Sequence, residues 1–202
     1  MNLPNKLTIA RMFAVLIIII VSLIQPLRDI VLFASVTLED IILLVIFIAA
    51  SFTDYLDGHI ARKNNLVTNF GKFMDPLADK LLVLSTLIIL LERGKFVAFG
   101  FGFGFAITII LAREFAVTGI RLIAVSNQVV IAASKLGKFK TVTQMLMIIV
   151  LLLDCYPFAL LGGASKDVTA LILIILATSM TLISGIDYFI KNRHVLKENT
   201  EN

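Results

Sequence analysis

Long hydrophobic runs separated by short polar segments dominate the pattern along the chain. Six runs are long enough to cross a bilayer, which takes about 20 mostly apolar residues in a helix. They cover residues 8–27, 39–61, 72–92, 97–124, 137–160 and 168–190. Before them, NLPNKLTIAR mixes polar and apolar positions, as short amphipathic segments at a membrane interface do. The pattern predicts an all-α integral membrane protein with six transmembrane helices and a short amphipathic N-terminal segment.

Composition agrees with a membrane protein. Of the 202 residues, 59% are hydrophobic and 16% are charged, and a soluble domain of this length cannot bury so much apolar surface. A chain of this length normally forms one domain, so residues 1–202 are expected to make a single membrane domain. One cysteine, Cys155, excludes an intrachain disulfide. The first run lacks a cleavage pattern of small residues, so we expect it to be retained.

The basic residues predict the orientation in the membrane. With the N-terminus inside, 14 of the 18 Lys and Arg residues fall at cytoplasmic ends, and Arg28, Arg93, Lys95 and Lys166 fall outside. Such a bias sets membrane topology, so both termini are expected in the cytoplasm. The net charge of +4 therefore indicates membrane topology. The basic residues do not alternate with aromatic ones as in a nucleic-acid groove, which argues against nucleic acid as a partner.

Four aspartates gather between the second and third runs, in TDYLDGHIARKNNLVTNFGKFMDPLADK (53–80). Asp54 and Asp57 are three residues apart and Asp75 and Asp79 are four apart, so each pair shares a helix face. A short connection makes the two helices neighbours and brings the pairs together. Four carboxylates so close repel unless cations neutralise them, and Mg²⁺, Mn²⁺ and Ca²⁺ prefer oxygen ligands. The spacing predicts a two-metal site that clamps phosphoryl oxygens on the cytoplasmic side.

Each of these carboxylates alone has a simpler interpretation. Carboxylates at helix ends commonly stabilise a helix N-terminus or solvate the interface. Four together favour a functional site, because ionisable groups at membrane depth are costly. Glycines in FGFGFGF (99–105) do not precede the Lys-Ser/Thr of a phosphate loop, so we interpret them as helix-packing positions.

The aspartate segment resembles the signature of the CDP-alcohol phosphatidyltransferase family: Asp54-x2-Asp57-Gly58-x2-Ala61-Arg62-x8-Gly71-x3-Asp75-x3-Asp79. Six spans also resemble that family, so the similarity covers nearly the whole chain as one such membrane domain. The resemblance implies transfer from a CDP-linked lipid to an alcohol with release of CMP, by a homodimeric enzyme. It implies that the four aspartates hold two Mg²⁺ or Mn²⁺ ions and that Asp79 is also the catalytic base. Contacts to the CDP-lipid are then expected from Asn5, Thr8, Asp54, Gly58, Ala61, Arg62 and Gly71.

Basic residues downstream bear on the acceptor alcohol. LAREFAVTGIRLIA (111–124) and KLGKFKTVTQM (135–145) contain Arg113, Arg121, Lys135, Lys138 and Lys140, all on the predicted cytoplasmic side. Such a cationic cluster suits an acceptor that carries a phosphate.

Lysines at these positions also serve as topology signals. Arg113 and Arg121, near two helical turns apart within an apolar run, favour a bound anion or a pair with Glu114. With PNKLTIAR (4–11), these stretches resemble the phosphatidylglycerophosphate synthase branch. That resemblance implies that CDP-diacylglycerol and glycerol 3-phosphate react, and that the five basic residues bind the acceptor phosphate.

Other acceptor alcohols, and one other class of membrane protein, are also compatible with the sequence. The acceptor alternatives are phosphatidylglycerol, giving cardiolipin, an inositol phosphate, or serine, which would not need the cationic cluster. Carboxylates in membranes also mark ion and proton transporters. Transporters carry those charges near the midplane between repeated halves, whereas here they lie at one membrane face in a chain without a convincing repeat.

Overall fold

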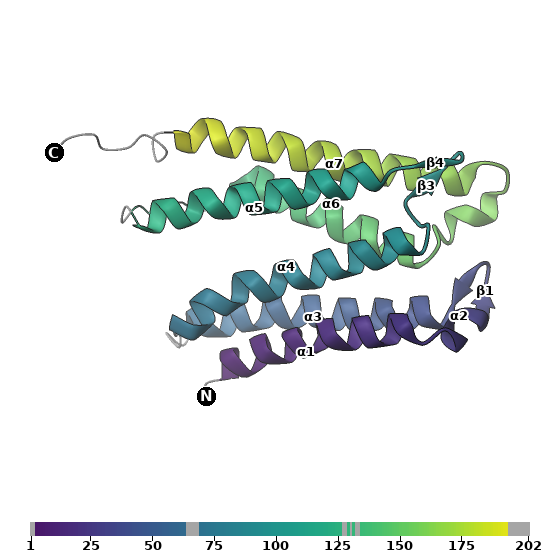
Figure 1. Ribbon diagram of the computed structural model, residues 1–202, viewed down its shortest axis with the longest axis horizontal. Helices are drawn as coiled ribbons and strands as arrows, with labels where there is room; N and C mark the ends of the chain where they lie inside the picture. The colour runs from purple at the N-terminus through teal and green to yellow at the C-terminus, as the bar shows by residue number, and fades with distance from the viewer. Residues whose placement is uncertain (1–2, 64–68, 127–128, 130, 132–133, 194–202) are drawn as a thin grey trace. The chain divides into compact units, whose positions relative to one another are not determined.

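The computed structural model describes residues 3–63, 69–126, 129, 131 and 134–193. Side chains are described for these residues except 3–7, 54–63, 69–73, 75, 76, 79 and 126. Within this part the six long helices are α1 (Leu3–Leu23), α3 (Leu38–Lys63), α4 (Asn69–Glu92), α5 (Gly104–Ser126), α6 (Lys135–Leu152) and α7 (Ser165–Asn192). Figure 1 shows these helices as the dominant elements. Each lies on one of the six predicted hydrophobic runs.

Short elements occupy the connections between the long helices. They are α2 (Pro26–Asp29), the antiparallel pair β1 (Val31–Phe33) and β2 (Val36–Thr37), the antiparallel pair β3 (Val97–Ala98) and β4 (Phe101–Gly102), and the 3₁₀ helix η1 (Phe158–Leu161). In the first hairpin Val31 pairs with Thr37, and in the second Val97 pairs with Gly102. The described chain is therefore mainly helical, with two small hairpins that the hydrophobic pattern did not predict.

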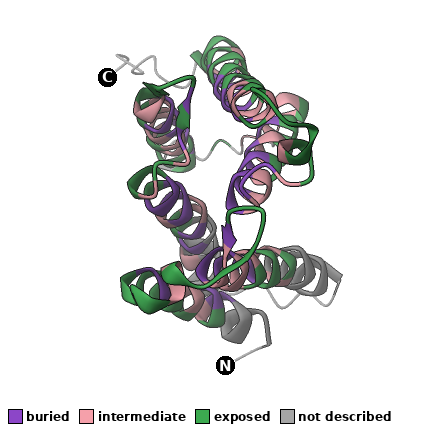
Figure 2. Cartoon of the chain, turned by 90° about the vertical axis from the view of Figure 1, so that its right-hand side faces the viewer, coloured by how far each residue is buried: buried purple, intermediate pink, exposed green. Residues whose placement is uncertain are grey.

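The chain folds as two compact units, each made of two segments. The first comprises Met1–Lys95 and Ile148–Lys166, and the second comprises Phe96–Met147 and Asp167–Asn202. Within each unit the long helices are buried along one side and exposed along the other (Figure 2). The single membrane domain expected over residues 1–202 stays a prediction.

In the first unit, α1 packs along both α3 and α4. The buried faces consist of large apolar side chains, and Ile18, Leu43, Phe47, Leu82 and Leu87 are almost completely buried. Leu43 and Phe47, four residues apart, lie on the same face of α3. In a bilayer such helices associate through close van der Waals packing, because lipid is as apolar as these side chains.

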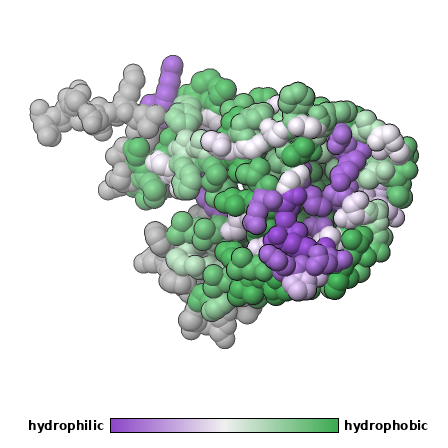
Figure 3. All heavy atoms as spheres, turned by 45° about the vertical axis from the view of Figure 1, so that its right-hand side comes forward, coloured by the Kyte–Doolittle hydropathy of each residue, from purple (hydrophilic) through white to green (hydrophobic). Residues whose placement is uncertain are grey.

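Large apolar side chains also cover much of the outer surface, as the hydrophobic green areas of Figure 3 show. Phe13, Phe105 and Ile172 are examples that point outward and are exposed. An exposed apolar surface of this extent marks contact with a membrane or a partner.

Helix α7 is by itself long and apolar enough to cross a bilayer, with 28 residues and an 18-residue stretch whose mean hydropathy is 2.2. Among the described residues it is the one helix that meets both conditions. Helix α5 is interrupted by three charged residues, Arg113, Glu114 and Arg121. The number of six crossings therefore stays a prediction.

Two predicted spans have different bounds in the structure. Residues 97–102 form the β3–β4 hairpin, so the helix predicted over 97–124 begins at Gly104. Gly100 has φ +77° in the hairpin turn, which glycine adopts without steric cost, so its interpretation as a helix-packing position was wrong. The helix predicted over 137–160 ends at Leu152, and Asp154 follows with φ +53°.

At the N-terminus α1 is continuous from Leu3, and its described backbone shows no break between an amphipathic segment and the first span.

Charged side chains join helix ends of the first unit. Arg28 Nε donates to Glu39 Oε2 at 3.2 Å, and Arg93 also pairs with the fully buried Glu39 carboxylate. Burial, reinforced by the positive charge of Arg28, lowers the pKa of Arg93 to about 10. Arg93 therefore keeps its charge at neutral pH and neutralises Glu39.

Lys95 connects two further buried carboxylates of this unit. Its Nζ lies 2.9 Å from Asp154 Oδ1 and 3.4 Å from Asp40 Oδ2, and Lys166 Nζ lies 2.6 Å from the other oxygen of Asp154. Asp40 also receives the Thr37 N–H at 3.1 Å, while its own N–H donates to Thr37 Oγ1 at 3.2 Å. This reciprocal cap fixes the start of α3. These pairs hold Asp154 at the place where the chain turns, within a predicted span.

Replacing Lys95 with Ala is expected to destabilise the protein by about 3 kcal/mol, because it removes one partner of a buried ion pair. Lys166 still neutralises Asp154, so the loss falls mainly on Asp40. Thermal unfolding in detergent measures the effect. The control is Lys191→Ala, which breaks an exposed pair with Asp187 and should cost less than about 1 kcal/mol. Equal losses in the two variants would contradict a structural role for the buried network.

Candidate functional site

The ends of two adjacent helices carry the aspartate signature. Asp54 and Asp57 lie in the last turns of α3, and Asp75 and Asp79 lie in the first turns of α4. The two helices pack against each other and are joined by residues 64–68. Helical backbone at both pairs puts the members of each pair on one helix face. The side chains of the four aspartates lie outside the described residues.

The predicted CDP-lipid contacts fall on the same helices and on α1. Their backbone positions are Asn5 and Thr8 in α1, Asp54, Gly58, Ala61 and Arg62 in α3, and Gly71 in α4. Of these, the side chain described is that of Thr8, which is completely buried. All seven positions belong to the first unit, in which α1 packs along α3 and α4.

Helix α1 also buries a charged residue that the sequence indicated as a topology signal. Arg11 is 1% exposed and is one of the largest fully buried side chains of the described part. It lies three residues after Thr8, so both are on one face of α1. A buried guanidinium is costly unless it is paired. Arg11 is therefore an interior residue of the unit that contains the aspartates, which a count of flanking charges could not indicate.

In the second unit, two of the predicted acceptor residues meet at one carboxylate. Arg113 Nη1 donates to Glu114 Oε1 at 3.1 Å, and Lys140 Nζ pairs with the same oxygen. All three side chains are largely buried. Two positive charges on one negative charge leave the cluster with a net charge of +1. A buried excess of positive charge can bind an anion such as a phosphate.

Arg121 is the third predicted acceptor residue with a defined partner. Its Nε donates to the Tyr188 hydroxyl at 3.2 Å, and its Cζ lies 5.6 Å from the centre of the Tyr188 ring. Tyr188 is buried with Val117 and Ile120. Arg121 itself is exposed, so it extends from an ordered core toward the surface, where a soluble ligand can reach its guanidinium.

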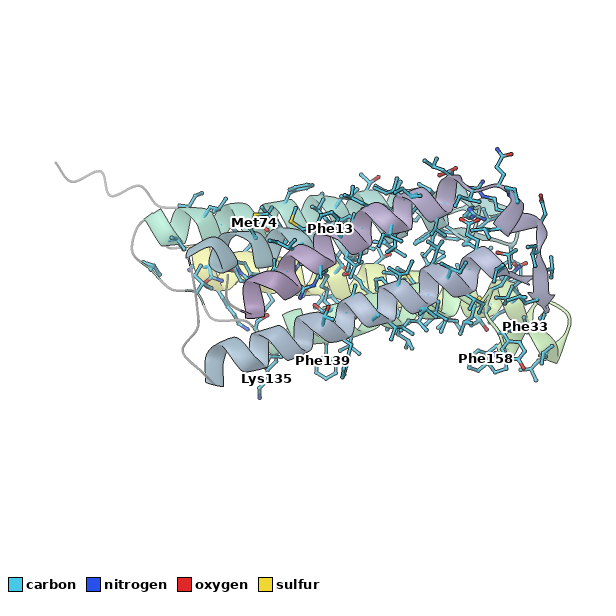
Figure 4. All side chains as sticks on the ribbon, turned by 90° about the horizontal axis from the view of Figure 1, so that it is seen from below. Phe13, Phe33, Met74, Lys135, Phe139 and Phe158 are labelled. Atoms are coloured by element: carbon cyan, nitrogen blue, oxygen red, sulfur yellow. The ribbon has the colours of Figure 1, made fainter. Side chains whose placement is uncertain are left out.

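Lys135 and Lys138 differ from Lys140. They lie in the first turn of α6 and are exposed, and in the part of the chain with described side chains neither forms an ion pair. Figure 4 labels Lys135 and the exposed Phe139 on the same side of the ribbon. The structure thus brings Arg113 and Lys140 together and leaves Lys135 and Lys138 on the surface.

Helix α7 contributes polar residues that the sequence interpretation missed. Ser184 accepts a hydrogen bond from Arg113 Nη2 at 3.1 Å, and Thr181 accepts one from Gln144 Nε2 at 3.1 Å. Ser184 and Thr181 are completely buried. Their spacing along an otherwise apolar run, continued by Thr178 and Tyr188 at intervals of three and four, was the available signal.

The chain belongs to the CDP-alcohol phosphatidyltransferase family, whose sequence model matches residues 1–183. This confirms the resemblance seen in the aspartate segment, and it places the chain among membrane-embedded enzymes that depend on divalent metals. Among individual proteins, it is 43% identical over 199 residues to the CDP-diacylglycerol–glycerol-3-phosphate 3-phosphatidyltransferase of Bacillus subtilis (strain 168), covering 97% of each chain.

Proteins with the same name from two other bacteria are also similar. The Rickettsia typhi protein is 37% identical over 188 residues, covering 93% of this chain and 95% of the relative. The Mycoplasma pneumoniae protein is 42% identical over 166 residues, covering 78% of this chain and 69% of the relative. Each of these matches extends over most of both chains.

Proposed function

We propose that the protein transfers the phosphatidyl group of CDP-diacylglycerol to sn-glycerol 3-phosphate, giving phosphatidylglycerol phosphate and CMP in phospholipid biosynthesis. Family membership and the shared name of the similar bacterial proteins support this activity. The structural observation that favours a phosphorylated acceptor is the buried cluster of Arg113, Glu114 and Lys140 with its net positive charge. A neutral acceptor such as serine would not require that charge.

The donor set of the aspartate segment fits divalent metals. Asp54, Asp57, Asp75 and Asp79 supply carboxylate oxygens from adjacent helix ends, which suit Mg²⁺ or Mn²⁺. Two such ions, when bound, neutralise the pyrophosphate of the CDP-lipid and stabilise the leaving CMP. Small residues at positions 58, 61 and 71 leave room for the CDP group, while Asn5, Thr8, Asp54 and Arg62 supply polar contacts to it.

The reaction needs a base and an oriented acceptor. The carboxylate of Asp79 takes the proton from the primary hydroxyl of glycerol 3-phosphate. The hydroxyl oxygen then forms a bond to the phosphorus on the lipid side, and the bond from that phosphorus to the bridging oxygen breaks, so that CMP leaves with the oxygen. Arg113, Arg121 and Lys140, with Lys135 and Lys138, bind the phosphate of the acceptor and hold its hydroxyl for attack.

The proposed topology has six membrane spans, an amphipathic N-terminal segment and both termini in the cytoplasm, in a homodimer of the cell membrane. The supporting observations are the distribution of basic residues along the chain and the exposed apolar surface of the helices. With this orientation the aspartates face the cytoplasm, where a water-soluble acceptor reaches a lipid donor.

Purified protein with CDP-diacylglycerol and Mg²⁺ or Mn²⁺ is expected to release CMP with glycerol 3-phosphate and far less with other acceptors. The panel contains phosphatidylglycerol, an inositol phosphate and serine, which represent the alternative members of the family. Lipid products separated by chromatography identify the acceptor used. Efficient turnover with serine would show that the cationic cluster does not select the acceptor, and no CMP with any alcohol would refute the transferase activity.

A further inference from the structure

One face of α7 contacts both arginines of α5. Ser184 and Tyr188 are four residues apart, so they lie on the same side of the helix, and both are buried. Ser184 binds Arg113 and Tyr188 binds Arg121, each through a side-chain hydrogen bond. The two arginines, eight residues apart on α5, thus have matched partners one turn apart on α7.

The Ser184 hydroxyl has a defined orientation. It donates to the Thr181 carbonyl at 3.1 Å, so its lone pairs point elsewhere, and one of them accepts from Arg113 Nη2. Glu114 holds the other terminal nitrogen, Nη1. Two of the five N–H groups of the guanidinium are therefore used in these hydrogen bonds. Among the described residues Arg113 Nε has no hydrogen-bond partner, so the group is fixed in place but not saturated.

Gly185 makes room for the stem of Arg113. A Cβ at this position would lie 3.0 Å from Arg113 Cγ, which is tighter than most carbon–carbon contacts. Since Cγ is near the base of the side chain, it cannot move aside without moving the guanidinium that Ser184 and Glu114 hold. A side chain at position 185 would therefore push Arg113 Cγ by a few tenths of an ångström.

Tyr188 positions Arg121 in a different way. Its ring belongs to the buried cluster with Val117 and Ile120, so its hydroxyl is held rigidly. The hydroxyl accepts from Arg121 Nε at 3.2 Å, which leaves the N–H groups of both terminal nitrogens of this exposed arginine outside that bond. A long, flexible side chain is thereby restrained before a ligand arrives, which reduces the entropy lost on binding.

We propose that Ser184, Gly185 and Tyr188 form an arginine-positioning face, which sets the affinity for the phosphate of the acceptor without touching the substrate. The inference rests on the proposed function, because it assigns Arg113 and Arg121 to acceptor binding. It means that α7 also influences the affinity of the acceptor site. It also explains why the polar and small residues Ser184 and Gly185 interrupt this apolar helix. The three residues act through the arginines, so they are positioning residues.

The test compares Ser184→Ala, Gly185→Ala and Tyr188→Phe with the wild type in detergent or nanodiscs. Loss of one orienting hydrogen bond is expected to raise the KM for glycerol 3-phosphate by roughly three- to tenfold. The KM for CDP-diacylglycerol should stay within twofold. Gly185→Ala should have at least as large an effect, and Ser184→Thr, which retains the hydroxyl, should restore the acceptor KM. Unchanged acceptor KM values in Ser184→Ala and Tyr188→Phe would overturn the inference.

Thr178→Val is the matched control for a purely structural effect. Thr178 is also a buried hydroxyl residue of α7, but its hydroxyl donates to the Ile174 carbonyl of its own helix at 2.7 Å. This variant should leave the ratio of the two KM values at the wild-type level. If Ser184→Ala and Tyr188→Phe change both KM values in parallel, the face has a structural role and the inference is wrong.

Arg113→Ala in the same assay separates this inference from the proposed function. If Arg113→Ala raises the acceptor KM while Ser184→Ala and Tyr188→Phe do not, the inference about α7 fails and the acceptor role of Arg113 stands. If Arg113→Ala leaves the acceptor KM unchanged, the proposed acceptor site itself is wrong, and the positioning face falls with it.

Discussion

Asp79→Asn is expected to lower kcat by about a thousandfold, within the range that general-base catalysis contributes. The amide cannot accept the proton of the attacking hydroxyl, and it is a weaker ligand for a divalent cation than a carboxylate. The asparagine has nearly the same size, so the α4 backbone is expected to keep its conformation. The rate of CMP release at saturating CDP-diacylglycerol and glycerol 3-phosphate measures the effect.

Asp29→Asn is the control for this substitution. Asp29 is an exposed aspartate in the short helix α2, outside the proposed site, so its amide variant should keep wild-type kcat. If Asp79→Asn retains more than about a tenth of the wild-type kcat, the loss falls below the range that a general base contributes. A different group would then have to remove the proton.

The helices could be predicted from the sequence because each needs a long run of apolar residues, which is a local property. Their ends could not, because other interactions decide them. The apolar FGFGFGF segment satisfies a hydropathy criterion, yet residues 97–102 pair as a hairpin. The helix of the fifth run ends at Leu152, just before Asp154, whose partner Lys95 is distant in sequence and lies 2.9 Å away. Such tertiary contacts leave no trace in a local pattern.

In the candidate site, too, local features could be predicted from the sequence and long-range contacts could not. The helical spacing of Asp54, Asp57, Asp75 and Asp79 is a local pattern, and the structure does place these residues in helices joined by a short connection. The pairing of Arg113 with Glu114 was also predicted, although adjacent residues of a helix do not normally face each other.

The partners of Arg113 and Arg121 on α7 could not be predicted from the sequence. Ser184 lies 71 residues from Arg113 and Tyr188 lies 67 residues from Arg121. No spacing rule connects residues so far apart. The burial of Arg11 likewise depends on how α1 packs along α3 and α4, so a count of charges at helix ends assigned it to topology alone.

Arg113→Ala is expected to raise the KM for glycerol 3-phosphate by about a hundredfold. Two charge-assisted hydrogen bonds to a phosphate contribute together about 3 kcal/mol, and each 1.4 kcal/mol corresponds to a factor of ten. The substitution also changes the net charge of the cluster from +1 to zero, because Glu114 stays paired with Lys140. That remaining pair avoids an isolated buried carboxylate, so the fold should persist. Initial rates at varied glycerol 3-phosphate and saturating CDP-diacylglycerol give the acceptor KM.

Arg193→Ala is the control that shows whether the rise in acceptor KM is specific to Arg113. Arg193 is an exposed arginine just after α7, and it lies on the same predicted cytoplasmic side. Its removal tests whether any cytoplasmic positive charge attracts the acceptor, and it should change the acceptor KM by less than twofold. Arg113→Ala should leave the KM for CDP-diacylglycerol near the wild-type value, because the proposed contacts to that substrate belong to α1, α3 and α4. A parallel rise of both KM values would mean that Arg113 supports the fold, and an unchanged acceptor KM would mean that other residues bind the phosphate.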